Sequence, residues 1–129
     1  MPIERHPSPS SFAPSIGFSG SVRAGDWLLF AGITAVDPHG ALIGGDSAYE
    51  QTREALRKLE DALTGAGGRL DQVISTRMYL TDASLWREVG RAHREAFAHA
   101  PPAATMIVVG GLLDARMLVE IEAVAYAGP

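Results

Sequence analysis

The stretch from Met117 to Ala125 is apolar except for two carboxylates, Glu120 and Glu122. Residues two apart along a β-strand share one face, so both acids point to the same side of a strand that otherwise indicates burial. A carboxylate in such a place must be paired, hydrogen-bonded or neutralised. The residues alone leave two interpretations open. Either this is a strand with a solvated face or a structural ion pair, or the acids belong to a functional site.

The composition sets limits on function. The chain has 129 residues, a formal net charge of -4, no cysteine and one lysine, Lys58. This length suits one domain around one core, and the acidic balance argues against binding a phosphate backbone. Without cysteine or a close His/Asp/Glu cluster, no metal site is expected. No apolar run approaches the roughly 20 residues of a membrane span, and residues 1–15 lack a signal-peptide core, so a cytoplasmic location is expected by default.

Hydrophobic periodicity and turn residues predict the order of elements. They predict a hairpin over residues 20–33, a helix over 46–66, a strand over 73–80, a second helix over about 82–99, and two strands around Gly110-Gly111. Ser47 and Glu50 have capping-box spacing at the start of the first helix. Residues 1–15, rich in Pro and Ser, are expected to be a loose arm, and residues 16–129 a single domain.

This order predicts an α+β fold with a single mixed sheet and both helices on one face. The other face must then be covered or wet. Apolar side chains expected on that face would come from Ile74, Thr76, Met78, Leu80, Ile107 and Val109. An uncovered apolar sheet face predicts a partner subunit.

The C-terminal segment resembles the signature of the RidA family (YjgF/YER057c/UK114), in which a Pro-Ala-Arg strand precedes a Val-Glu-Ile-Glu-Ala strand. Pro102-Ala103 and Val119-Glu120-Ile121-Glu122-Ala123 match it, and Ala104 stands where the family has arginine. The resemblance covers roughly residues 16–126. It implies a chorismate-mutase-like fold that assembles as a homotrimer with a central β-barrel. It also implies a small-molecule enzyme that acts on imines or enamines in intersubunit clefts without a cofactor.

The resemblance implies roles for particular residues. Glu120 falls on the catalytic glutamate, which positions or activates water for imine hydrolysis. The family's substrate-binding positions fall on Phe18, Ala31 (before Gly32), Ala104 and Met106. Thr105 either donates a hydrogen bond to a ligand or is an ordinary strand residue. Three of the family positions have lost the family's polar group, because Phe18, Ala31 and Ala104 replace tyrosine, serine and arginine. A charge-assisted bond of that arginine type contributes about 1.5–3 kcal/mol, so deamination of 2-aminoacrylate is expected to be weak and an uncharged or bulkier ligand is favoured.

Three further polar residues are candidates for substrate contacts. Arg77, in the middle of a strand, is either solvated or the partner of a buried acid that could replace the lost arginine's charge. His93, near the apolar stripe of the second helix, is either a packing residue or a ligand contact. Glu122 is either a structural ion-pair partner or part of the site. Apolar surroundings are expected to raise the pKa of Glu120, as suits a general acid or base.

Two functions remain open at this point. The favoured one is an imine or enamine hydrolase of the deaminase type, in which Glu120 moves a proton. The alternative is a non-catalytic small-molecule-binding or accessory trimer, which the three lost polar groups favour. Nucleic-acid cleavage, an activity attached to relatives of this family, is disfavoured by the net charge of -4. No nucleic-acid or membrane partner is expected.

Overall fold

A computed structural model describes residues 2–129 of the chain. Six strands form one mixed sheet in the order β1-β2-β3-β6-β4-β5. They are β1 (Ile3–Pro7), β2 (Ser19–Ala24), β3 (Trp27–Ile33), β4 (Val73–Leu80), β5 (Ala103–Val108) and β6 (Val119–Tyr126). The pair β4/β5 is parallel, and the other neighbouring pairs are antiparallel. The predicted single mixed sheet is therefore confirmed.

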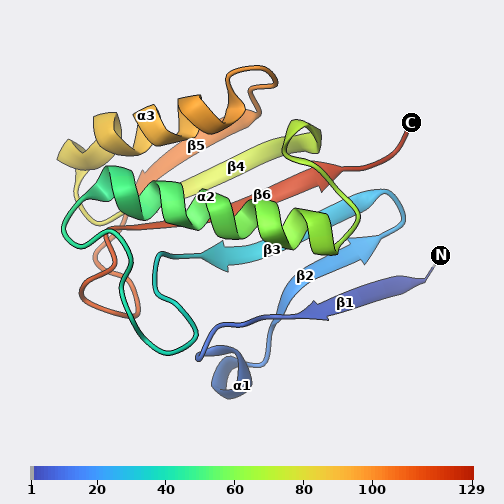
Figure 1. The fold of residues 1–129 in the computed structure, drawn as a ribbon, viewed down its shortest axis with the longest axis horizontal. Helices are drawn as coiled ribbons and strands as arrows, with labels where there is room; N and C mark the ends of the chain where they lie inside the picture. The colour runs from blue at the N-terminus through green and yellow to red at the C-terminus, as the bar shows by residue number, and fades with distance from the viewer. Residues whose placement is uncertain (1) are drawn as a thin grey trace.

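Two long helices, α2 (Ala48–Gly65) and α3 (Trp86–Phe97), lie on the same face of this sheet (Figure 1). The predicted cap of α2 is present, since the Ser47 hydroxyl accepts a hydrogen bond from the Glu50 backbone N–H at 3.1 Å. A short helix α1 (Ala13–Ile16) and two single 3-10 turns, η1 (Leu70–Gln72) and η2 (Ala83–Leu85), complete the elements. None of the helices in residues 2–129 has the length and apolarity needed to cross a bilayer.

The core fills the space between the helices and the sheet. Along β6, alternate residues are buried against the helices, and the residues between them face the other side. Helix α2 contributes Leu59 and Leu63, and α3 contributes Val89, all with at most 1% of their surface exposed. The core is thus one-sided, and within residues 2–129 neither long helix covers the opposite face of the sheet (Figure 1).

The N-terminal segment corrects one expectation. Residues 1–15 were expected to be a loose arm, but Ile3–Pro7 form the edge strand β1, which pairs antiparallel with β2. The pairing uses backbone groups, so it needs no apolar alternation in the sequence. Residue 1 lies outside the described part of the chain.

A second correction concerns which β4 side chains reach the open face. Thr76, Met78 and Leu80 are at most 2% exposed and face the helices, not the open side. The register of β4 against β6 shifts between Val73 and Ser75, so Ile74 is an extra residue at a bulge. After this shift Arg77 and Tyr79 point to the open face, opposite Glu122 and Glu120 of β6. The open face is therefore more polar in its centre than the sequence predicted.

Candidate functional site

Glu120 lies on the open face of β6, directly above Gly32 of β3. A Cβ atom built on Gly32 would lie 2.8 Å from the Glu120 carboxyl carbon, closer than any side chain permits. The φ angle of Gly32 is not positive, so the feature that distinguishes this glycine is the close approach of Glu120 and not a turn. With no side chain at residue 32, the Glu120 carboxyl can occupy the space where a Cβ would lie, and a larger residue would make it move.

A β-bulge creates this contact. In the β3/β6 register Phe30 pairs with Ala123 and Ile33 pairs with Ile121, so Ala31 and Gly32 together oppose Glu122. Bulges redirect side chains and are frequent beside active sites. Both residues were sequence candidates, but the bulge itself was not predicted, because apolar alternation does not reveal an inserted residue.

The environment of Glu120 favours its protonated form. Partial burial raises the pKa of Glu120 above its usual value, and the negative charge of Glu122 raises it further. Within residues 2–129 no Arg, Lys or His nitrogen lies within ion-pairing distance of Glu120. The result is a half-buried carboxyl group with a raised pKa and no ion-pair partner among residues 2–129, properties that suit a general acid or base.

Glu122, by contrast, has a partner. The Tyr79 hydroxyl donates a hydrogen bond to Glu122 Oε1 across the β4/β6 pair. This bond raises the pKa of Tyr79, since deprotonation would place a second negative charge beside Glu122, while the nearby Arg77 acts in the opposite direction. Tyr79 was not among the predicted site residues. Its place two residues after Arg77 on the same strand is the signal that could have identified it.

The site candidates on β5 divide between the two faces of the sheet. Thr105 pairs with Arg77 and shares the open face. Ala104 and Met106 pair with the buried Thr76 and Met78, and Met106 Cε packs against Gly90 of α3, so both lie on the helix side. Within one chain, therefore, Ala104 and Met106 are not brought together with Glu120. Phe18, half-buried just before β2, completes the candidates from the first hairpin.

His93 also lies on the helix side. Its Nε2 is 2.8 Å from the Thr76 hydroxyl, and its ring packs against Phe97 with centroids 4.7 Å apart. Burial lowers the pKa of His93, so the imidazole is neutral at pH 7. His93 therefore lies beside Ala104, which neighbours Thr76 on the adjacent strand, and far from the open face that carries Glu120.

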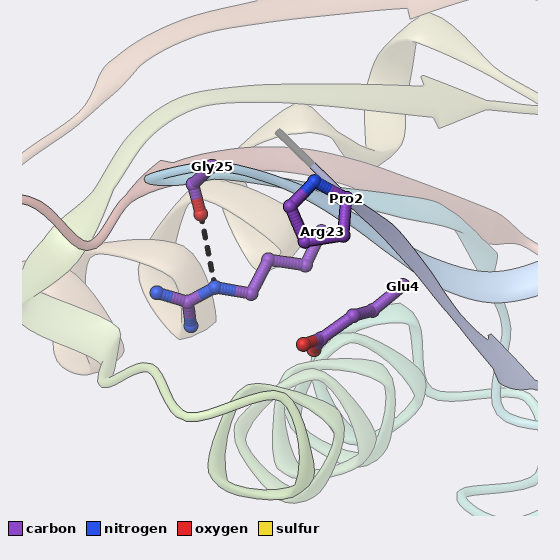
Figure 2. A pocket seen from close by; sticks show the side chains of 4 residues that line it. All are labelled: Pro2, Glu4, Arg23 and Gly25. Carbon is purple, nitrogen blue, oxygen red and sulfur yellow. Dashed lines mark hydrogen bonds between the residues drawn. The ribbon is translucent and has the colours of Figure 1, made fainter.

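A hollow in the surface of the protein lies away from all of these candidate residues. It lies at the β1–β2 end of the sheet and is lined by Pro2, Glu4, Arg23 and Gly25 (Figure 2). Arg23 donates hydrogen bonds to the carbonyl oxygens of Gly25 (2.9 Å) and Ala66 (3.0 Å), which tie the hairpin turn to the end of α2. This hollow is therefore part of the scaffold. Among residues 2–129, no group of three His, Asp or Glu side chains could hold a metal ion.

Comparison with known proteins identifies the family. The family model described as Endoribonuclease L-PSP matches residues 8–127. A crystal structure of a Mycobacterium tuberculosis member of the highly conserved YjgF/YER057c/UK114 family superimposes with a TM-score of 0.87 at 42% identity, covering 97% of this chain and 99% of that one. The chain belongs to the YjgF/YER057c/UK114 (RidA) family. The predicted family and fold are thereby confirmed.

Sequence relatives within the RidA family differ in what is known of them. A Streptomyces coelicolor protein described as uncharacterized is 38% identical over 126 residues, 98% of this chain and 93% of that protein. The 3-aminoacrylate deaminase RutC of Acinetobacter baylyi is 27% identical, over 92% of this chain and 91% of that protein. The family thus includes a protein named as a deaminase of an enamine, and its model carries the name of a nuclease.

Proposed function

We propose that this chain is a homotrimeric hydrolase of the C=N bond of a small imine, or of the enamine that tautomerises to it, with Glu120 as the general acid and base. The observation that carries the proposal is the half-buried Glu120 carboxyl above Gly32, with a raised pKa and no ion-pair partner among residues 2–129. A raised pKa brings a carboxyl group closer to the range in which it can both accept and return a proton. The deaminase name of a family relative supports the same reaction type.

The proposed reaction needs only water, with Glu120 moving one proton at a time. The Glu120 carboxylate takes a proton from water as the water oxygen forms a bond to the imine carbon, and it passes that proton to the imine nitrogen to give a neutral carbinolamine. Glu120 then takes the hydroxyl proton of the carbinolamine and delivers it to the nitrogen as the C–N bond breaks and the C=O bond forms, so the nitrogen leaves as ammonia or an amine. The products are a carbonyl compound and the released nitrogen species, so the carboxylate is regenerated. No step requires a metal or an oxidant.

The assembly is part of the proposal because one chain divides the candidate residues between two faces. The edge strand β5 carries Ala104 on the helix side and has a free outer edge, while Glu120 lies on the open face. A neighbouring copy that brings its β5 edge to this open face would complete a cleft. Trp27 and Leu29, each nearly half exposed on the same face, are apolar surface that such a copy would cover. Light scattering should give about three times 13.7 kDa, and a stable monomer would contradict the cleft.

The decisive variant is Glu120→Gln, which keeps the shape of the side chain but cannot exchange a proton. Ammonia release from amino-acid-derived and amide-derived imines generated in situ is measured for the wild type and the variant. Turnover should fall by roughly 10²–10⁴, the usual contribution of general acid–base catalysis, while ligand binding persists. Gly32→Ala should also reduce turnover, because the new methyl group displaces the Glu120 carboxyl. Wild-type turnover that survives Glu120→Gln unchanged would make Glu120 structural.

The alternative function is a non-catalytic small-molecule-binding trimer. The apolar residues at Phe18, Ala31 and Ala104, where the family resemblance places polar groups, favour this alternative. It predicts that Glu120→Gln changes ligand affinity with no turnover to lose. Nuclease activity, in the name of the family model, is opposed by the net charge of -4 and by the two acids on the open face.

A further inference from the structure

His93 has an unused hydrogen-bonding atom. Its Nε2 contacts the Thr76 hydroxyl, whereas its Nδ1 makes no hydrogen bond within residues 2–129. Among residues 2–129, the buried side-chain nitrogen without a hydrogen-bond partner is His6 Nε2. His93 Nδ1 also lacks a partner but is not buried in this way, so it is accessible to solvent. The ring is held in place by Thr76 and Phe97 while one nitrogen stays available.

The Thr76 hydroxyl determines which nitrogen carries the proton. Thr76 is 1% exposed, and His93 Nε2 is its hydrogen-bond partner among the described residues. A buried O–H group must donate its hydrogen to an acceptor, and Nε2 is the acceptor within reach. The neutral imidazole therefore carries its own proton on Nδ1, and the free atom is a hydrogen-bond donor. Burial, which lowers the pKa of His93, keeps the ring in this neutral form.

The contacts of His93 place its ring near β5, an edge strand of the sheet. Gly90, one helical turn before His93, lies against Met106, and Thr76 is the register partner of Ala104. Because α3 runs above β5 in this way, the turn that carries His93 lies above Ala104. Ala104 is exposed and has the smallest side chain other than glycine, so it leaves room beside the ring.

We infer that His93 Nδ1–H is the donor that binds a neutral carbonyl oxygen of the ligand, such as that of a carboxamide, at the Ala104 edge of the cleft. The inference rests on the proposed function only in using the same cleft. Phe97, which packs against the His93 ring, and Ala104 and Met106, on the strand beneath this part of α3, are all apolar. A carboxylate in this position would lose hydration without gaining a counter-charge, whereas a neutral carbonyl needs one donor. His93 is then a residue that determines specificity by selecting an uncharged group.

Two substitutions separate ligand binding from packing. In His93→Asn the side-chain amide reaches the Nδ1 position and keeps the donor but loses the Thr76 contact. In His93→Gln the amide reaches the Nε2 position, which keeps the Thr76 contact but loses the donor. A ligand contact therefore predicts that Asn retains binding and Gln loses it. If His93 only packs against Thr76, the His93→Gln variant should bind the ligand like the wild type, and His93→Asn should bind it more weakly.

The test uses pyruvamide and pyruvate as probes, because pyruvamide carries a neutral carboxamide where pyruvate carries a carboxylate. Each is titrated into the full-length protein labelled with 15N, and the His93 imidazole nitrogens and the amides of Ala104 and Thr105 are followed by NMR. The chain has four histidines, so the variants also assign the His93 signals. We expect pyruvamide to bind more tightly than pyruvate and to shift the Nδ1 resonance. Loss of one neutral hydrogen bond in His93→Gln should weaken pyruvamide by about 3- to 10-fold, and His93→Asn should stay within about 3-fold of wild type.

Several outcomes would overturn the inference. These are tighter binding of pyruvate than of pyruvamide, no binding of either probe, shifts that avoid β5 and α3, or unchanged pyruvamide affinity in His93→Gln. Binding and turnover are read separately. If pyruvamide binds through His93 while no imine is hydrolysed, the inference stands and the proposed hydrolase function fails. If imines are hydrolysed but His93→Gln binds pyruvamide normally, the hydrolase stands and the role of His93 fails.

Discussion

The two faces of β6 differ in how completely the rest of the chain buries them. On the helix side Val119, Ile121, Ala123 and Ala125 are at most 3% exposed, and α2 and α3 complete their packing. On the open side the alternate residues, from Glu120 to Tyr126, remain half-buried. The helices of the same chain therefore complete the packing of one face of β6, whereas the described residues leave the other face half-buried. Stability is concentrated on the first face and the candidate chemistry on the second.

The largest expected effect tests the difference in stability between the faces. Ile121→Ala removes a fully buried side chain and should lower the free energy of unfolding by about 2–5 kcal/mol in chemical denaturation. Leu29→Ala, on the open side, should instead reduce the mass measured by light scattering. Equal destabilisation by both variants with no change in mass would mean that the faces do not differ in this way.

The next prediction tests whether Ala104 limits the chemistry on the open face of a neighbouring copy. Ala104→Arg introduces a bidentate partner for a carboxylate and should raise ammonia release from 2-aminoacrylate by about 10- to 100-fold. Ala103→Arg is the matched control, because residue 103 is adjacent, also exposed and directed to the other face. An equal gain from both substitutions would indicate a general charge effect and not a pocket at Ala104.

A smaller effect on the free energy of unfolding is expected when a tyrosine hydroxyl that bonds a glutamate is removed, and it should differ between the two sides of the sheet. Tyr79→Phe removes the hydroxyl that bonds Glu122, and should lower the free energy of unfolding by about 0.5–1.5 kcal/mol. Tyr49→Phe removes a bond to Glu95 on the exposed surface of the helix layer and should have less effect. The order is checked by parallel urea unfolding of both variants. A larger loss in Tyr49→Phe would show that the open-face cluster is not a stable unit.

The smallest expected effect is a pH dependence of stability that comes from Glu120. Its pKa is raised in the folded protein above the value near 4.5 of the unfolded chain. At a pH between these two pKa values, the native state binds more protons than the unfolded state. Stability contributed by this group therefore falls as pH rises through that window. Glu120→Gln removes the effect, so the variant should gain stability relative to wild type at neutral pH, and the gain should disappear below about pH 4. A gain that grows toward acid pH would have the wrong sign and would contradict the raised pKa.

Much of the scaffold could be predicted from local patterns. The Ser47–Glu50 cap and the strand from Val73 to Leu80 appear where the sequence indicated them. These features depend on neighbours within a few residues, and their signals lie in the chain itself. The edge strand β1 was missed because its pairing with β2 uses backbone hydrogen bonds that no side-chain pattern reports.

The candidate site was predictable only in part. Glu120 and Glu122 were recognised as sharing a face, because the period of a strand is fixed. The role of Gly32 beneath Glu120 follows from the β3/β6 bulge, and the bond from Tyr79 to Glu122 follows from the β4/β6 register. Register depends on long-range pairing, and a shift of one residue moves every later side chain to the other face. This is why Thr76, Met78 and Leu80 were assigned to the wrong side.

The sequence by itself determined the types of the main elements after residue 16, the family, the one-sided helices and the two acids on a shared face of β6. These rest on periodicity, capping and a local signature, all of which are short-range properties. The tertiary structure alone decided that Glu120 has no ion-pair partner among residues 2–129 while Tyr79 donates a hydrogen bond to Glu122, and that Ala104 and His93 lie on the other side of the sheet from both acids. The reason is that burial, register and charge pairing arise from strands that meet only in the folded sheet.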